Sequence, residues 1–284
     1  MTGNSLENTF EVVRSSVVAF ASKVVRRERP QFPEIIGTGF VVDPCGVVAT
    51  NRHVIDALQA LPRHPNRNEP SAFCILPTSI QRSGDQRHMG TLFVGIRGYH
   101  VLESFVPAGP YYGQGLPDFG FIQLEVQQLP ALKLSEEEFS LRVGMPIATA
   151  GFPLGTDALL IYEKISQVMP FLRHGVVSSV LPFPCPYPHG FTIDVMGQGG
   201  ASGSPIFLAD RPIAVGILHA GFPGTNITYG VPSTLLAKGL EECLKSSPPD
   251  LTGVPTLADL VARSERNDIL TWEPFRAERP PEAG

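Results

Sequence analysis

Between residues 34 and 231 the apolar positions fall in many short runs, rich in β-branched and aromatic side chains and separated by glycine and proline. Stretches with the 3.6-residue period of an amphipathic helix are rare in this part of the chain. Such a pattern is typical of an all-β barrel or sandwich. The polar stretch 79–97 begins with turn residues and is predicted to be a long loop. Examples of the expected strands are residues 36–42, 46–50, 72–76, 119–126, 146–152, 175–180, 213–218 and 228–231.

Helical patterns lie mainly at the margins of this region. A helix is predicted after Pro232, where two cap-forming hydroxyl residues precede leucines at helical spacing. A short helix is expected directly after His53. Beyond a proline-rich linker, a last amphipathic helix is predicted over residues 256–270, with Thr256 and Asp259 as its capping box.

Composition narrows the class of function. The chain has 284 residues and is 43% hydrophobic, so it is long enough to bury one large core or two ordinary ones. With 22 basic and 27 acidic side chains it has no overall basic field for nucleic acid or an anionic membrane surface. It has no apolar run of the roughly 18 residues that span a bilayer, and its polar start lacks the pattern of a signal peptide. We therefore expect a protein or peptide partner, neither nucleic acid nor membrane, and a cytoplasmic location.

The cysteines lie far apart in the sequence, without the paired spacing of a metal site or a regular disulfide framework. Reduced cysteines buried in the core are the expected outcome, because free cysteine behaves as a small apolar residue. The four are Cys45, Cys74, Cys185 and Cys243.

The strongest chemical signal is the segment GASGSP at residues 200–205, in which Ser202 lies between glycines. Glycines allow the backbone to bend so that a serine hydroxyl is exposed while nearby N–H groups converge on one point. Acyl transfer needs this arrangement. A simple glycine and serine turn between strands is the alternative interpretation.

A histidine with an informative context lies far upstream. The segments GTGFVV at residues 37–42 and GVVATNRHV at residues 46–54 place His53 just after a predicted β-hairpin and at the start of a short helix. The chain contains seven histidines, and this context distinguishes one of them.

Together these motifs resemble the trypsin-like serine peptidases of the chymotrypsin fold, particularly the bacterial branch with the high-temperature-requirement proteases and glutamyl endopeptidases. In that family a G-x-G-F-x-V hairpin leads to T-x-x-H-V, a D-[FIL]-[AG]-[LI] strand start follows, and G-x-S-G-[GS]-P comes last. This chain has GTGFVV, TNRHV, DFGF at residues 118–121 and GASGSP in the same order. The resemblance extends from about residue 37 to about residue 244. Shorter matches within it are residues 151–155, 174–178, 215–217 and 229–233.

The resemblance implies two antiparallel six-stranded Greek-key barrels followed by a C-terminal helix and a tail. Residues 1–127 would form an N-terminal barrel that carries the catalytic histidine and aspartate. Residues 128–246 would form a C-terminal barrel and helix that carry the serine. Residues 247–284 would be the tail, with a possible short helix. They are too few for the peptide-binding domain that follows the protease in high-temperature-requirement enzymes.

The resemblance also implies a mechanism. Ser202 would attack the scissile carbonyl, His53 would act as its general base, and Asp118 would orient His53. The backbone N–H groups of Gly200 and Ser202 would form the oxyanion hole. No cofactor and no metal ion would be needed.

Asp118 has the least sequence context of the three. As an alternative, it is a turn residue that caps the strand after Pro117. Asp194 and Asp210 are competing carboxylates, but both lie close to Ser202 in the sequence and lack the family's aspartate context.

Two departures from the family pattern bear on activation and specificity. Ala201 precedes the nucleophile, where trypsin-type zymogens carry an aspartate that pairs with a newly cut N-terminus. Activation by N-terminal trimming is therefore not expected, and an activating protein partner or loop movement would replace it. Met196 matches the base of the primary specificity pocket and supplies no charge, so a neutral or apolar P1 side chain is expected.

The segment that would line the pocket wall contains His219, Ala220 and Gly221. Glutamyl endopeptidases place a histidine in this segment that recognises acidic P1 residues. Here the spacing is displaced by one residue, so His219 would either serve that purpose or face Asp118.

There are three alternatives to a serine endopeptidase with a neutral or apolar P1 preference. An esterase-like acyl hydrolase of the α/β type would need alternating strands and helices around its nucleophile, which the pattern does not have. A catalytically silent double barrel that binds proteins is the second. A partner-activated protease with an acidic P1 preference is the third.

Overall fold

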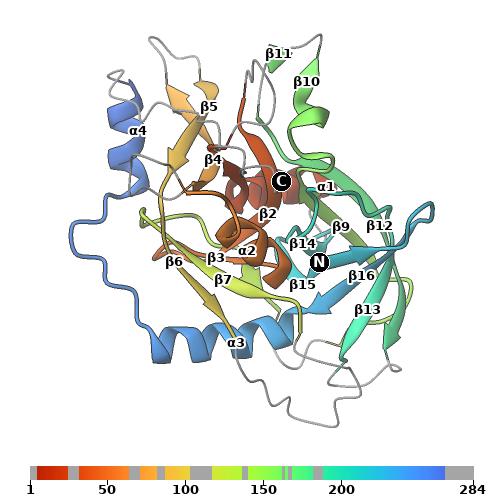
Figure 1. The fold of residues 1–284 in the computed structure, drawn as a ribbon. Helices are drawn as coiled ribbons and strands as arrows, with labels where there is room; N and C mark the ends of the chain where they lie inside the picture. Colours follow the sequence, from red (N-terminus) through yellow and green to blue (C-terminus); the bar gives the residue numbers. More distant parts are fainter. Residues whose placement is uncertain are drawn as a thin grey trace, which may run out of the picture.

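The computed structural model shows two groups of antiparallel strands that lie side by side, with the strands early in the sequence on one side and the later ones on the other (Figure 1). Alternating burial along the strands produces this arrangement. In β1, Val17–Ser22, the side chains of Val18 and Phe20 join a cluster inside the first sheet. Val17, Ala19 and Ala21 point the other way into a cluster shared with the second sheet. The structure describes residues 5–24, 32–63, 71–81, 87–102, 117–135, 140–161, 164–165, 168–181 and 188–265.

The first sheet contains seven antiparallel strands in the order β5-β4-β1-β2-β3-β7-β6. Within the described residues its edge strands β5 and β6 do not pair with each other, so this sheet is a half-barrel and not the closed six-stranded barrel that was expected. Its other strands are β2 (Glu34–Asp43), β3 (Val47–Thr50), β4 (Ala72–Gln81), β5 (Arg87–Val94), β6 (Ile96–Val101) and β7 (Gly120–Leu124).

The second sheet closes on itself through the pairing of β14 with β15, which makes a six-stranded barrel with β8 added in parallel to β15. Its core is built around side chains such as Phe191 and Ile206. The strands are β8 (Lys133–Leu134), β9 (Pro146–Gly151), β12 (Phe171–Leu181), β13 (Gly190–Asp194), β14 (Pro205–Leu208), β15 (Ile213–Gly221) and β16 (Ile227–Pro232). The all-β double-barrel class predicted from the sequence is confirmed.

One prediction for the first sheet was wrong, and one strand of this sheet was not predicted. The stretch 79–97, predicted to be a loop, contains the end of β4 and all of β5, which pair from Cys74 with Val94 to Gln81 with Arg87. The strand β1 lies outside the region where strands were expected. Its residues are buried on both faces, so the sequence there is uniformly apolar and lacks an alternating pattern.

Helices pack against both sheets, with α2 (Arg52–Gln59) on the first sheet and α3 (Ser233–Ser246) mainly on the second. The predicted helix after His53 is α2, and the predicted late helix is α3. Short helical segments that were not predicted flank the strands. These are α1 (Leu6–Val13), η1 (Arg14–Ser16) and η2 (Gly155–Leu159), and the small hairpin β10 (Leu160–Ile161) and β11 (Lys164–Ile165) follows η2. No helix in the described ranges is both long and apolar enough to cross a membrane.

The last helix, α4 (Leu257–Glu265), packs on the first sheet next to β4 and β5 (Figure 1). Leu257, Leu260 and Val261 contact the core cluster of that sheet. The predicted capping box is confirmed, because Thr256 and Asp259 exchange hydrogen bonds of 2.7 to 3.1 Å. Packing onto the barrel therefore accounts for the described part of the tail.

Of the cysteines, Cys45, Cys74 and Cys243 are free, and the last two are buried as expected. Burial raises the pKa of the Cys74 and Cys243 thiols, which fits inert core cysteines. Cys185 lies outside the described residues.

Candidate active site

His53 is positioned by the junction between β3 and α2. The strand ends at Thr50, and the buried Asn51 follows it as the residue before the first turn of the helix. The side chain of Asn51 donates a hydrogen bond of 2.7 Å to the backbone carbonyl of Asp118. This bond ties the helix start to the segment just before β7 and joins residues that are 67 positions apart in the sequence.

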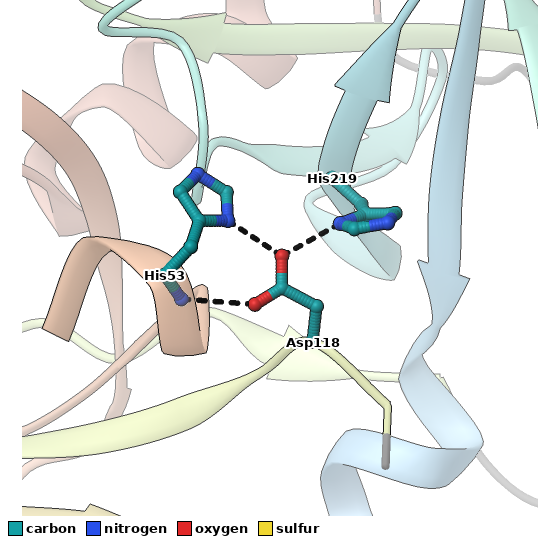
Figure 2. Close-up of side chains that lie close together, drawn as sticks. All are labelled: His53, Asp118 and His219. Atoms are coloured by element: carbon teal, nitrogen blue, oxygen red, sulfur yellow. Dashed lines mark hydrogen bonds and ion pairs between the residues drawn. The ribbon is translucent and has the colours of Figure 1, made fainter. Parts of the chain in front are cut away.

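Asp118 holds His53 with both of its carboxylate oxygens. Its Oδ1 accepts the backbone N–H of His53 at 3.0 Å, and its Oδ2 lies 2.6 Å from His53 Nδ1 (Figure 2). The backbone contact fixes the position of the residue, and the ring contact fixes the orientation of the imidazole. The competing carboxylate Asp194 is exposed at the end of β13 and has no such contact with His53 among the described residues.

A second histidine, His219 on β15, approaches Asp118 from the opposite side (Figure 2). Its Nδ1 also lies 2.6 Å from Asp118 Oδ2, and the centres of the two imidazole rings are 6.4 Å apart. Partial burial raises the pKa of the Asp118 carboxyl, but the hydrogen bonds from His219 and His53 outweigh it and hold that pKa well below its usual value. Of the two positions considered for His219, the structure shows the one that faces Asp118.

Thr38 on β2 fastens the serine loop to the first sheet. Its backbone N–H donates to the carbonyl of Ser202 at 2.9 Å, and its hydroxyl donates to the carbonyl of Gly200 at 2.7 Å. The side chain is fully buried. Sequence reasoning quoted this threonine only as part of a hairpin motif and missed its contact with residues more than 160 positions away.

Gly203 also lies against Thr38, and this close approach requires a glycine. Its φ of +88° lies in the left-handed region, and a Cβ there would overlap the carbonyl oxygen of Thr38. We expect Gly203→Ala to lower the free energy of unfolding by more than the roughly 1–3 kcal/mol of a strained backbone, because the overlap with Thr38 adds to it. Urea denaturation measures the effect. Gly199→Ala in the same loop is the control, because a Cβ there meets no atom within 4 Å. Equal stability of both variants would contradict this explanation.

The backbone around the serine leaves two N–H groups available. The N–H groups of Ala201, Gly203 and Ser204 donate to backbone carbonyls, whereas those of Gly200 and Ser202 donate no hydrogen bond within the described structure. The Gly199 carbonyl accepts a 2.6 Å hydrogen bond from Leu154 N–H. In a trans peptide the N–H points opposite to the carbonyl. The contact with Leu154, which the sequence did not reveal, therefore turns the N–H of Gly200 away from Leu154.

The hydroxyl of Ser202 and the ring of His53 are not hydrogen-bonded to each other in the part of the chain that the structure describes. The His53 side chain is half exposed and its Nδ1 is engaged by Asp118. Bonds between a nucleophile and its base are often long in an enzyme without substrate and shorten in the complex. The arrangement thus presents an oriented imidazole, an available hydroxyl and two available N–H groups.

Residues expected at the specificity pocket also come together. A Cβ added to Gly197 would lie 3.0 Å from Gly221 Cα, so the segment after Met196 runs beside the end of β15, which contains Ala220. Met196 is 42% exposed. Sequence reasoning did not identify Arg173 on β12, whose guanidinium donates hydrogen bonds to the Met196 carbonyl and to the side chain of Gln198. A positive charge therefore lies beside this segment.

Comparisons with known proteins give a consistent result. The model of the trypsin-like peptidase domain matches residues 37–217. Among solved structures, Deg5 is similar with a TM-score of 0.51 at 18% identity, over 88% of this chain and 95% of that one. An HtrA-type protease, AlgW, with a tripeptide is similar with a TM-score of 0.53 at 16% identity, over 85% of this chain and 64% of that one. No curated protein matches the chain in sequence.

Proposed function

Because the chain belongs to the trypsin-like peptidase family and is a serine protease, we propose that it is an endopeptidase with His53, Asp118 and Ser202 as its catalytic triad. The observation that carries this proposal is the double contact between Asp118 and His53, with the ring nitrogen 2.6 Å and the backbone nitrogen 3.0 Å from the carboxylate. The purified chain is expected to cleave internal bonds of a peptide library. A chain that binds the peptides and leaves them intact would instead be a protein-binding double barrel.

The contact with Asp118 determines the protonation state that the reaction needs. Because Asp118 accepts the Nδ1–H of His53, the neutral imidazole carries no proton on Nε2, which is then free to accept the proton of Ser202. The Ser202 oxygen attacks the scissile carbonyl and forms an acyl-enzyme as the amine leaves with that proton. Water then attacks the acyl group, again with His53 as the base. Asp118 stays ionised throughout, and its lowered pKa favours this role.

The N–H groups of Gly200 and Ser202 donate no hydrogen bond in the described structure, which supports their assignment as the oxyanion hole. Donors that are fixed before the reaction stabilise the developing negative charge, and a single one is typically worth about 10² to 10³ in kcat. The hydrogen bond from Leu154 to the Gly199 carbonyl fixes the peptide group that carries the Gly200 N–H.

His219 acts in this proposal as a positioning residue. It shares the Asp118 oxygen with His53, so it limits the movement of the carboxylate. Because its Nδ1 is used by Asp118, an acidic P1 preference read by His219 gains no support from this geometry.

Met196, expected at the specificity pocket, and Arg173 beside it support a preference for a neutral or apolar P1 side chain. Met196 supplies no negative charge, and the guanidinium of Arg173 opposes a basic side chain. In a library with every residue at P1, we expect cleavage after neutral or apolar residues to exceed cleavage after Lys and Arg by about 10²-fold or more, since a buried charge without a partner costs several kcal/mol. Efficient cleavage after Arg would refute this.

Arg173 favours a second candidate, a protease that prefers an acidic P1 residue. The variant Arg173→Met separates the two. The substitution should hardly change cleavage after apolar residues if Met196 determines the P1 preference. It should abolish a preference for Glu if the guanidinium reads the substrate.

The absence of a carboxylate at Ala201 supports activation by a protein partner or a loop movement in place of a new N-terminus. A protease of this kind is expected to be selective when it is isolated. Rapid degradation of unrelated unfolded proteins by the isolated chain would count against such control.

A further inference from the structure

Three side chains that commonly bind metal ions converge on one point of the candidate active site. They are His53, Asp118 and His219, and their ligand atoms all lie within 4.8 Å of one another. Imidazole nitrogen and carboxylate oxygen are the usual ligands of a zinc ion with three protein ligands and one open position. We propose that this cluster binds a divalent transition-metal ion, zinc in particular, and that the bound ion reversibly inhibits the protease.

The ligand atoms need only small movements to hold an ion. Zinc bonds of 2.0–2.1 Å in tetrahedral geometry place two ligand atoms about 3.3 Å apart. Each Nδ1 now lies 2.6 Å from Asp118 Oδ2, so these pairs must open by several tenths of an ångström. Rotation of the imidazoles achieves this. The side chains of His53 and His219 are 50% and 38% exposed, so the ion can reach the site from solvent.

A metal site at His53 and Asp118 depends on the third side chain, His219. A histidine and an aspartate alone offer two ligand atoms, which are too few for a three-ligand zinc site. His219 Nδ1, from β15 of the second sheet, approaches the same carboxylate oxygen and supplies the third ligand (Figure 2). The other two ligands come from the start of α2 and from the segment just before β7.

Inhibition follows from the position of one proton. A neutral imidazole has a single N–H, and binding of zinc through Nδ1 requires that proton to reside on Nε2. Coordination therefore moves the proton of His53 from Nδ1 to Nε2 through solvent and releases none. In this state Nε2 cannot accept the proton of Ser202. The only bonds formed are those from the ion to its ligands, so a chelator reverses the effect.

Binding is tested without any need for activity, by titrating zinc into the Ser202→Ala variant in a calorimeter. We expect a single ion per chain. In the same background, His219→Asn should weaken binding at least tenfold, since even residues that only support a metal ligand are worth about 10- to 100-fold in affinity. His174→Ala, which removes an exposed histidine on β12, should leave affinity unchanged. No binding, or equal binding by the His219→Asn variant, would overturn the metal site.

Two further measurements test the metal site even if the His219→Asn variant does not fold. Zinc should raise the Tm of the protein and of His174→Ala, but not that of His219→Asn. In the protein with His53, Asp118 and His219 intact, bound cobalt should give the visible absorption of a four-coordinate ion. Zinc should displace it. Absence of that absorption would count against the site.

The inhibitory part of this inference rests on the proposed function, and the binding part does not. In a peptidase assay, zinc should suppress cleavage by the protein and by His174→Ala, and EDTA should restore it. Full activity with zinc bound would overturn the inhibitory role. A chain that binds zinc at His219 but never cleaves peptides would refute the proposed function and leave the metal site standing.

Discussion

Replacement of Ser202 by alanine is expected to lower kcat for a peptide substrate by about 10⁴- to 10⁶-fold, because the variant lacks the oxygen that forms the acyl-enzyme. The fold should be unaffected. The hydroxyl of Ser202 makes no hydrogen bond in the described structure, while its backbone carbonyl keeps the bond from Thr38. Steady-state kinetics on a peptide that the parent protein cleaves measures the loss, and thermal unfolding verifies the fold.

Ser247→Ala is the matched control for this substitution. Ser247 is an exposed serine that follows α3, so its loss should change neither activity nor stability. Residual activity of the Ser202→Ala variant within tenfold of the parent protein would mean that another residue is the nucleophile.

The second large effect is expected for Asp118→Asn, with a fall in kcat of about 10⁴-fold. The amide is neutral, and its NH₂ group turned toward His53 would favour the tautomer with the proton on Nε2, which cannot serve as the base. The amide oxygen can still accept the backbone N–H of His53, so the local fold should persist. Kinetics on the same peptide gives the size of the effect, and unchanged KM would show that the loss lies in chemistry.

Asp194→Asn and Asp210→Asn test the competing carboxylates. Both residues are exposed, and neither has a described contact with His53. We expect both variants to keep the parent activity. A large loss in either of them, together with an active Asp118→Asn variant, would assign the role of the triad aspartate elsewhere.

The motifs in the sequence predicted the residues to which we assign the chemistry, because these signals are local. A glycine that must bend the chain next to Ser202, and a histidine where a strand gives way to a helix, each depend on neighbouring positions. The juxtaposition of His53 and Asp118 was expected only from family order, and the structure places them in contact.

The contacts made across the two sheets could not be read from the sequence in the same way. The bond from Thr38 to Gly200 joins residues 162 positions apart, and nothing in the local pattern of either residue indicates it. Arg173 likewise lies in an ordinary strand and gains its significance only from its neighbours. For His219 the sequence allowed two orientations, and the tertiary structure distinguished between them.

The errors in the fold prediction have a related cause. Strand β1 is buried on both faces between two cores, so its apolar run has no alternation that marks a strand. The sequence of β4 and β5 contains polar residues, and turn-forming residues lie between the two strands. This composition is typical of a loop. Periodicity detects a strand most easily when one of its faces is exposed to solvent, and β1 has no such face.

Labelling with a fluorophosphonate probe tests the central claim most directly, because the probe reacts with a serine only where a base and an oxyanion hole activate it. We expect the protein to be labelled at Ser202, with the adduct located by mass spectrometry, and the Ser202→Ala variant to remain unlabelled. Ser247→Ala should react like the parent protein. A well-folded parent protein that is not labelled, or a Ser202→Ala variant that is labelled equally, would contradict the assignment of Ser202 as the activated nucleophile.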